Sequence, residues 1–396
     1  MKAITAVVAA ITILAFGKTL AGQRSANFRL TVKGHLVPGD GGSSAGIALS
    51  FPYLCVAGQE KGLGIIDVSN PSKPTLAGTF NKGGWTRDVD LAGNLAYTAV
   101  SSQGLQIVDI ANPASPVLLG SYGGPSYDST GVQVVGQTAY LVNANGRVLI
   151  PVDVSNATKP VTGYPVLYGP NGSGNFNGIL VQGGIYIPND TGLAFSITPS
   201  LLTGVYWVDS LPSYDVAVNG SMAYLGRAGR WDIIDLSNPS QPRNVSKVPS
   251  GNVYSIHYVD DFVFTSHGGG LQVFDSSNPQ RPRMVGQFVA PGIGQGGPST
   301  RGTVKMIVRD NLIYLAEASC WGLWVLEFSA EIFQDGAFAL WRPAEQGKRY
   351  ILESKNNVND CCWTTVATNT AQTESIKLTD SSANGSQRFY RMSTLP

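Results

Sequence analysis

The sequence predicts an all-β fold: a seven-bladed β-propeller closed by its N-terminal strand, followed by a small antiparallel β-sandwich-like domain. A repeated motif, an aromatic residue ahead of each copy, and turns rich in glycine and proline together indicate this fold. The clearest copies begin at Gly62, Gly104 and Gly270, and each reaches an aspartate five residues later and Asn-Pro three residues after that. A period of about 40 residues is typical of propeller blades.

The spacing of the repeat can be counted between the aspartates that end its copies. The spacings are 42, 44, 82 and 40 residues, for Asp67, Asp109, Asp153, Asp235 and Asp275. The spacing of 82 spans two periods, with Ile197 at the place of the missing acid. The run Gly322–Glu327 is a last copy, which follows an insertion containing the Gly/Pro-rich stretch 291–298. An aromatic residue precedes each acid position by 11 to 14 residues and marks seven units: Tyr53, Tyr97, Tyr140, Tyr186, Tyr224, Phe264 and Tyr314.

Composition excludes one class of partner. Only 13% of the 396 residues are charged, the net charge is +1, and no basic run or stripe is present. Binding to a phosphate backbone requires clustered Lys and Arg, so we expect no nucleic-acid partner. The 47 glycines and 23 prolines lie mainly between short apolar runs, which favours turns over disorder.

The N-terminus resembles a secretory signal. Met1-Lys2 is followed by an apolar stretch, Ala3 to Phe16, and by a small-residue segment ending at Gly22. We expect a signal peptide over residues 1–21, cleaved after Ala21, because the apolar run is short for a membrane span. The alternatives are an uncleaved anchor and a disordered tail. No later stretch has 18 uninterrupted apolar residues, so we expect a secreted or cell-surface protein with no stable membrane span in its mature chain.

Each unit is expected to form four short strands. In the second unit these are Arg87–Leu91, Leu95–Val100, Leu105–Ile110 and Pro116–Tyr122, with Ala-Gly-Asn as a turn between the first two. Helical repeats would require apolar positions at 3.6-residue spacing, which the sequence lacks.

The two ends of the repeat region are expected to pair. Residues 28–35 resemble a fourth strand that stands before the first unit, whereas the last unit ends after its third strand at Glu327-Phe328. Pairing of these segments would complete a blade and remove an exposed edge.

The repeated aspartates are expected to shape turns. An Asp at a strand end followed by Asn-Pro suits a tight turn, because Asp and Asn side chains accept hydrogen bonds from nearby backbone N–H groups. A catalytic acid is required once per site, whereas this residue recurs in five units. The structural turn residues are therefore Asp67, Asp109, Asp153, Asp235 and Asp275.

These segments resemble LVIVD repeats, as in Leu105–Asp109 and Gly62–Asp67 with their Asn-Pro tails. The resemblance covers about residues 28–328 and departs in unit four, which lacks the acid, and in unit three, where Pro151 interrupts a strand. It implies a bacterial or archaeal exported or surface-associated propeller over residues 22–329, and it implies no established catalytic residues.

A separate module is expected over residues 330–396. Short segments of alternating apolar and polar residues are separated here by turns with Asn, Gly and Ser, which predicts a small antiparallel sandwich. These segments are 338–341, 349–353, 375–378 and 388–391. Its scattered aromatic residues resemble C-terminal modules of exported bacterial proteins, some of them like fibronectin type III domains. Surface attachment or sorting and a passive appended domain both fit this module.

The cysteines leave several arrangements open. Cys55 and Cys320 fall in units that ring closure would make neighbours, so a disulfide between them would staple the ring. The adjacent Cys361 and Cys362 fit a vicinal disulfide, intermolecular bridges or two thiols. No Cys-x-x-Cys or closely spaced His pair accompanies them, and we expect no metal or cofactor.

One face of the propeller is the candidate ligand site. Loops that lead into the innermost strands and loops that join second to third strands lie on the same side of a propeller. Aromatic residues, acids, arginines and two histidines fall there, and together they suit a sugar or a peptide. The residues expected on this face are Trp85, Arg87, Asp88, Tyr127, Asp128, Asn177, Asp190, Tyr214, Asp215, Arg227, Arg230, His257, His267, Glu317 and Trp321. Ordinary solvated loop composition is the competing interpretation.

Two functions stay open at this stage. The first is a non-catalytic exported propeller that binds an extracellular protein, peptide or glycan through this face. The second is an extracellular hydrolase or lyase with a site at the central channel, with or without Ca²⁺. No Gly-x-Ser-x-Gly elbow or Walker-type loop occurs. Grouping of His257, His267, Asp215 and Glu317 within hydrogen-bond reach would favour the enzyme, and their dispersal would favour binding.

Overall fold

The computed structural model describes residues 25–37, 44–123, 128–144, 148–162, 167–168, 175–196, 204–207, 211–290, 305–317, 321–334, 337–355, 363–373, 375–382 and 389–394. These residues form strands and turns and contain no helix. The described part of the chain therefore has no helix that is long and apolar enough to cross a membrane. The chain divides into two compact units. The larger unit holds residues 32–308 and 313–326, and the smaller unit holds residues 309–312, those from 327 onward and the described part of 1–31. The expected signal peptide, residues 1–21, lies outside the described residues.

The larger unit is a series of four-stranded antiparallel sheets, each built from consecutive strands. The first three sheets are β2 (Gly46–Ser50), β3 (Tyr53–Ala57), β4 (Leu63–Asp67) and β5 (Thr75–Phe80); β6 (Trp85–Ala92), β7 (Leu95–Ser101), β8 (Gly104–Asp109) and β9 (Val117–Tyr122); and β10 (Ser129–Val135), β11 (Thr138–Asn143), β12 (Val148–Asp153) and β13 (Val161–Thr162), with β14 (Leu167–Tyr168) also paired to β12.

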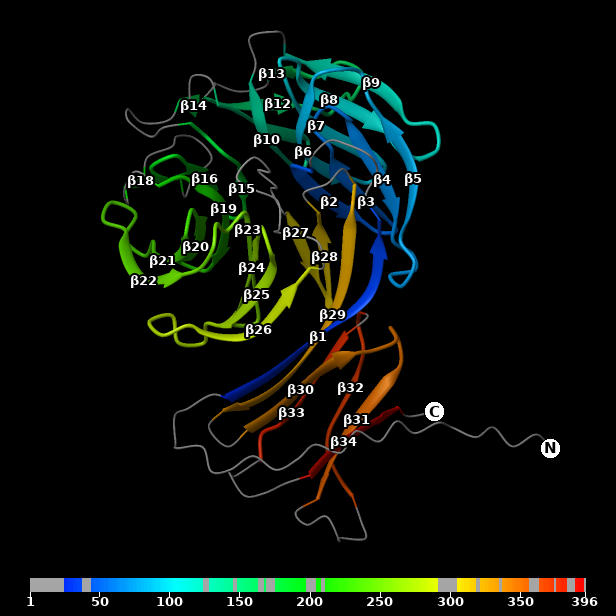
Figure 1. Cartoon of the computed structure of the whole chain (residues 1–396), viewed down its shortest axis with the longest axis vertical. Helices are drawn as coiled ribbons and strands as arrows, with labels where there is room; N and C mark the ends of the chain where they lie inside the picture. Colours follow the sequence, from blue (N-terminus) through cyan, green and yellow to red (C-terminus); the bar gives the residue numbers. More distant parts are fainter. Residues whose placement is uncertain are drawn as a thin grey trace, which may run out of the picture. The chain divides into compact units, whose positions relative to one another are not determined.

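Three further sheets follow the same order. They are β15 (Leu180–Val181), β16 (Ile185–Asn189), β17 (Gly192–Ser196) and β18 (Gly204–Trp207); β19 (Ser213–Asn219), β20 (Met222–Arg227), β21 (Arg230–Asp235) and β22 (Arg243–Pro249); and β23 (Ser255–Val259), β24 (Phe262–His267), β25 (Gly270–Asp275) and β26 (Arg283–Val289). The sheets follow one another around a common centre, with the first strand of each sheet innermost (Figure 1). Such blade-like sheets support a β-propeller fold.

The next strands of the chain are β27 (Met306–Arg309), β28 (Leu312–Ala316) and β29 (Leu323–Gln334), which are paired in that order. Strand β1 (Ser25–Leu36), from the start of the described chain, pairs with β29. This is the pairing expected between the segment 28–35 and the last unit.

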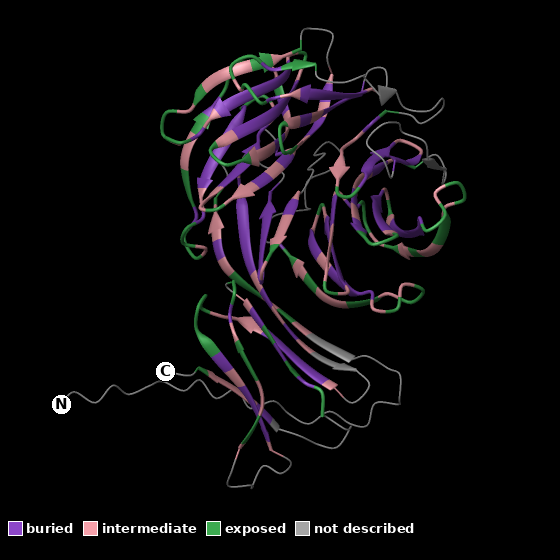
Figure 2. Cartoon of the chain, turned by 180° about the vertical axis from the view of Figure 1, so that it is seen from behind, coloured by how far each residue is buried: buried purple, intermediate pink, exposed green. Residues whose placement is uncertain are grey.

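Apolar side chains fill the spaces between consecutive sheets. One cluster joins the first two sheets and includes Cys55, Ile65 and Val108, and the next joins the second and third sheets and includes Ile107 and Leu141. Buried residues accordingly concentrate on the second and third strands of each sheet, whereas the outer strands are half-buried or exposed (Figure 2). Each sheet is therefore apolar on both of its faces.

The repeat aspartates accept hydrogen bonds within their own turns. In every case the backbone N–H two residues later donates to Asp Oδ1, at 2.8 to 3.0 Å. The donors are Ser69 to Asp67, Ala111 to Asp109, Ser155 to Asp153, Ser237 to Asp235 and Ser277 to Asp275. This is the geometry of an Asx-turn. The side-chain hydrogen bond takes the place of a further hydrogen bond of the sheet, and the strand therefore ends at the aspartate.

Glycines on the fourth strands allow neighbouring sheets to approach closely. A Cβ on Gly78 would collide with the carbonyl oxygen of Pro113, and one on Gly120 would collide with that of Ala157. Gly34, on β1, stands in the same relation to the carbonyl oxygen of Pro71. In each case the partner lies in the Asn-x turn of the following sheet.

The smaller unit contains two antiparallel sheets. Beside parts of β1 and β29 it has β30 (Ala337–Pro343), β31 (Arg349–Lys355), β32 (Thr364–Thr370), β33 (Ser375–Asp380) and β34 (Phe389–Thr394). One sheet places β30 between β29 and β33, and the other places β31 between β32 and β34. Residues of both sheets, among them Leu340, Leu352 and Tyr390, share one apolar core. The four strands expected in this module correspond to β30, β31, β33 and β34, and sequence reasoning missed β32.

Cys55 is a buried free cysteine, and burial raises the pKa of its thiol to about 12. Because Cys55 is free, the structure does not support the disulfide considered between Cys55 and Cys320. Cys320, Cys361 and Cys362 lie outside the described residues, so the alternatives for the adjacent pair stay predictions.

We predict that Gly78→Ala destabilises the protein, because its methyl group would force two sheets apart. The expected loss of unfolding free energy is about 1–3 kcal/mol, measured by chemical denaturation. Gly268→Ala is the matched control, because no atom lies within 4 Å of the position of its Cβ. Equal stability of the two variants would contradict the close approach.

Candidate binding face

The loop face is defined here as the residues that lead into the innermost strands together with the loops that join second to third strands. Its local structure repeats from sheet to sheet. A buried hydroxyl residue (Thr86, Ser129 or Ser213) lies within the first two paired residues of β6, β10 and β19, and the pairing register then skips one residue. The skipped residues are Arg87, Thr130 and Tyr214. A bulge of this kind turns the side chain of the extra residue out of the sheet.

The acids after these bulges bind the next sheet. The N–H of Val132 donates to Asp88 Oδ2 at 3.0 Å, and the N–H of Ile256 donates to Asp215 Oδ2 at 3.0 Å. Two positions further along, Asp90 accepts the N–H of Val134 at 2.7 Å. These carboxylates thus connect innermost strands of successive sheets, which gives them a structural role whether or not a ligand reaches them.

Other polar side chains make the same type of connection. Gln133 Oε1 accepts the N–H of Val181 at 2.6 Å, and His257 Nε2 lies 2.9 Å from the carbonyl oxygen of Met306. Burial lowers the pKa of His257, and the nearby Asp215 opposes that effect.

Asp88, on the innermost strand β6, has a carboxyl group whose pKa is strongly shifted. Burial raises the pKa of Asp88 from 3.8 to about 7, although Lys305 and the N–H groups of Val132 and Val89 act in the opposite direction. Burial also raises the pKa of Asp90. Lys305 Nζ lies 3.8 Å from Asp215 Oδ2, so this lysine is the cation that compensates the acids of the innermost strands.

Arg87 and Asp128 form an ion pair between two sheets. Arg87 Nη2 lies 3.2 Å from Asp128 Oδ1, and Ser101 Oγ donates to the same oxygen at 2.9 Å. Both side chains keep contact with water, with 37% and 27% of their areas exposed. Trp85, at the start of β6, is 53% exposed. Tyr127, expected beside Asp128, lies outside the described residues.

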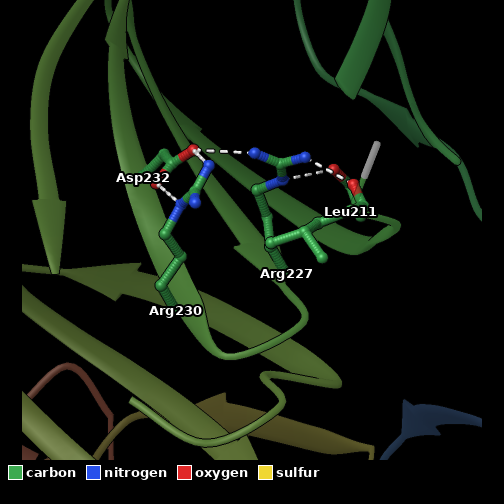
Figure 3. A network of polar contacts seen from close by, with 5 residues as sticks. Leu211, Arg227, Arg230 and Asp232 are labelled. Carbon is green, nitrogen blue, oxygen red and sulfur yellow. Dashed lines mark hydrogen bonds and ion pairs between the residues drawn. The ribbon is translucent and has the colours of Figure 1, made fainter. Parts of the chain in front are cut away.

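Arg227 was expected on the loop face but is fully buried, which corrects that expectation. Its guanidinium donates to Ser213 Oγ at 3.1 Å, to Asp232 Oδ2 at 3.2 Å and to the carbonyl oxygen of Leu211 (Figure 3). Arg230 donates from Nε to Asp232 Oδ1 at 2.8 Å. The carboxylate of Asp232 is completely buried between the two arginines. Sequence position alone could not reveal that the residue ending β20 is buried against polar groups of its own sheet and of the segment that leads into it.

The histidine and acid candidates separate into different contacts. His267 Nδ1 accepts the N–H of Gly269 at 3.2 Å, and burial lowers the pKa of this histidine. Glu317 Oε1 lies 2.5 Å from Nε2 of His35, whose ring stacks on Trp324. The four residues whose grouping would favour an enzyme therefore share no hydrogen bond among the described contacts.

Trp321 and the remaining candidates also have structural neighbours. The indole of Trp321 packs on Gly64, where a Cβ would lie 2.5 Å from the ring. Asn177 donates to Asp190 at 3.0 Å and to the carbonyl oxygen of Ser213 at 2.9 Å. The ring of Tyr214 lies 5.3 Å from that of Tyr254. The ligand-binding role of all these residues stays a prediction.

Sequence reasoning missed four residues of this region. Tyr254 and Lys305 each precede an innermost strand, so counting from the neighbouring repeats would have found them. Gln103 lies in the loop that joins the second and third strands β7 and β8, so the same rule would have found it, whereas Asp90 lies inside β6 and carries no such signal. Within the described ranges, no three His, Cys, Asp or Glu side chains are grouped so that they could hold a metal ion.

We predict that Arg227→Met is strongly destabilising, because it removes one partner of a buried carboxylate. The expected loss is about 3 kcal/mol, measured by urea unfolding. Arg243→Met is the control: its side chain is 77% exposed in a pair with Asp235, so its effect should stay below about 1 kcal/mol. A small effect at both positions would show that the buried network contributes little.

The pKa of Asp88 predicts a pH dependence of stability. Because the folded pKa is raised from 3.8 to about 7, the stability associated with its protonated form is present below pH 3.8 and declines as pH rises through 7. Asp88→Asn keeps an acceptor for Val132 and removes the titration. We therefore expect the variant to gain on the wild type by up to about 4 kcal/mol between pH 4 and pH 8, in urea titrations. Parallel stability curves would contradict this assignment.

Comparison with known proteins identifies the repeat. The LVIVD repeat matches five times, at residues 41–82, 83–123, 128–163, 213–249 and 250–289. These matches cover the first, second, third, fifth and sixth units and leave the fourth, which lacks the acid, unmatched. No curated protein matches the chain.

Among solved structures, the crystal structure of the computationally designed Ika8 protein is similar, with a TM-score of 0.51 and 10% sequence identity. The match covers 91% of this chain and 98% of that one, and at this identity it speaks for the fold alone. The repeat matches and the sheet structure that coincides with them show that the chain belongs to the LVIVD-repeat family.

Proposed function

We propose that the protein is a secreted or cell-surface β-propeller of seven blades that binds an extracellular protein, peptide or glycan through its loop face without transforming it. In this proposal the segment 1–21 directs export. The C-terminal unit, residues 330–396, is free to serve in surface attachment. Nucleic acid is not a partner, in keeping with the low charge.

Three contacts support a closed ring of seven blades. Strand β1 pairs with β29 and so supplies a fourth strand to the last blade. Gly34 on β1 approaches Pro71 of the first blade in the same way that Gly78 approaches Pro113. Trp321, from the last blade, packs on Gly64 of the first. Closure of this kind removes two exposed edges.

The observation that carries the binding proposal is the exposed Trp85 beside the Arg87–Asp128 pair. Most polar residues of the loop face are engaged in connecting successive sheets, but this group still presents aromatic, cationic and anionic atoms to water. Tryptophan and arginine are the residues that most often dominate binding energy at interfaces. The half-buried pair Tyr214 and Tyr254 adds a second aromatic position on the same face.

An extracellular hydrolase or lyase is less well supported. His257, His267, Asp215 and Glu317 each contact a different partner. General acid–base catalysis requires such groups within hydrogen-bond reach of one reacting atom. We therefore do not propose catalysis.

The proposal is tested by screening the mature chain, residues 22–396, against glycan and peptide arrays. We expect capture of at least one ligand, recovery of that ligand with unchanged mass, and loss of capture in the variant Trp85→Ala, Tyr214→Ala, Tyr254→Ala. The control variant Leu76→Ser, Val117→Ser alters exposed outer-strand residues and should bind normally. Empty arrays, capture that survives the triple substitution, or cleavage of the ligand would each refute the proposal.

A further inference from the structure

Trp85 is unusual among the aromatic residues of this protein. In the described part of the chain only Phe51 and Trp85 are exposed aromatics, at 50% and 53%. Phe51 lies in the turn between β2 and β3, at the opposite end of the blade from the loop face. The positions that correspond to Trp85 one residue before the buried hydroxyl are Asp128 and Pro212. The repeat itself therefore does not require a large aromatic residue here.

The backbone that carries Trp85 is fixed on both sides. Thr86 exchanges two hydrogen bonds with Gln59 of the preceding blade, both at 3.0 Å, through the N–H and C=O of each residue. On the other side, Asn81 Oδ1 accepts the N–H of Gly83 at 2.7 Å and shapes the approach to β6. An aromatic side chain on such a rigid support is preorganised for contact and loses little entropy on binding.

Planar polar groups lie close to the chain segment that carries Trp85. Gly83 and Gly84 have φ values of +83° and +80°, and without side chains they leave room for the amide of Gln103, whose Nε2 would lie 3.1 Å from a Cβ on Gly84. Arg87 follows two residues after Trp85 and holds Asp128. Both described contacts to the Asp128 carboxylate use Oδ1, so Oδ2 stays available as an acceptor. Gln103 Oε1 already accepts a hydrogen bond from Gln106 Nε2. The group thus offers guanidinium and amide donors next to a carboxylate acceptor.

Two features distinguish between ligand classes. The charges of Arg87 and Asp128 compensate each other, which favours an uncharged ligand. Among the described residues, the other exposed large apolar side chain on this face, Leu211, belongs to a different blade, so the described part of this blade offers no second exposed apolar group beside Trp85 for a peptide side chain. A pyranose ring has one apolar C–H face and an edge of hydroxyl groups that both donate and accept. It matches a flat aromatic surface rimmed by planar polar groups.

We propose that Trp85, Arg87, Gln103 and Asp128 form a carbohydrate subsite in which the indole stacks on a neutral pyranose and the polar groups bind its hydroxyls. This inference rests on the proposed binding function and specifies its ligand as a neutral oligosaccharide. Trp85 supplies most of the affinity, and the three polar residues select among sugars.

The test is calorimetric titration of the mature chain with soluble tetrasaccharides of glucose, xylose, mannose and N-acetylglucosamine, combined with tryptophan fluorescence. We expect at least one of them to bind and to change the emission. Trp85→Ala should weaken binding about tenfold or more, Trp85→Phe should retain part of it, and Asp128→Asn should change the preference among sugars. Phe51→Ala, the matched exposed aromatic, should bind as the wild type does.

Any other result contradicts either the carbohydrate subsite alone or the binding function as well. Binding that Trp85→Ala leaves intact refutes the subsite, as does binding confined to sulfated or uronic-acid oligosaccharides. If the tetrasaccharides fail while array peptides bind through the loop face, the carbohydrate assignment is wrong and the proposed binding function stands. If neither sugars nor peptides bind, both fail. Circular dichroism and unfolding curves establish that the variants are folded.

Discussion

The larger unit depends on the apolar layer buried between each pair of consecutive sheets. Strand pairing stays within each sheet apart from an isolated bridge between Thr86 and Gln59. Neighbouring sheets are therefore joined mainly through side chains, as in the cluster that packs Ile65 of one sheet with Val108 of the next. Each fully buried aliphatic side chain contributes roughly 1.5–3 kcal/mol, and these layers recur between successive sheets. Because every blade is stabilised mainly by its two neighbours, the arrangement behaves as a chain of adjacent interfaces. Correct spacing between sheets is therefore the first requirement on the sequence.

The required spacing between sheets explains several residues that would otherwise suggest a catalytic or binding site. Glycines on fourth strands, such as Gly78, are needed because a carbonyl oxygen of the next sheet occupies the place of a Cβ. On the innermost strands, where the sheets converge and apolar packing is narrow, Asp88, Gln133 and Asp215 bind backbone N–H groups of the following strand. A set of acids and a histidine on the innermost strands resembles an active site in sequence. In this protein the acids accept backbone N–H groups, and His257 contacts the carbonyl oxygen of Met306, so these polar groups are not left buried without partners.

Sequence periodicity predicted the sheets well because a blade is a local unit whose four strands are consecutive. The repeat acids mark equivalent positions in all matched units, since each ends a third strand. Tyr53 shows the limit of such counting. It pairs with Asp67 itself, whereas Tyr97 pairs with Ile107, two residues before Asp109. Cys55, which pairs with Ile65, therefore occupies the place that Tyr97 has in its own sheet. Strand β32 escaped detection because Thr364–Thr370 is mostly threonine, with no large apolar alternation. Arg227 was misplaced because spacing gives the end of a strand but not the direction of the side chain across a bulge.

In a repeating chain, equivalent positions can be compared from blade to blade, and this comparison distinguishes structural residues from candidate binding residues. Residues that recur at equivalent positions, such as the turn aspartates and the buried Thr86, Ser129 and Ser213, are explained by a requirement that every blade shares. The position after these hydroxyls is free of that requirement, because the bulge releases it from pairing, and it holds Arg87, Thr130 and Tyr214 in different blades. Variation confined to released positions places different chemistry around one face without disturbing the layers beneath it. A binding surface on this fold can therefore be expected where the repeat permits difference. Arg87 lies at a released position, and Trp85 is paired with Ser101 at a position that holds Asp128 and Pro212 in other sheets.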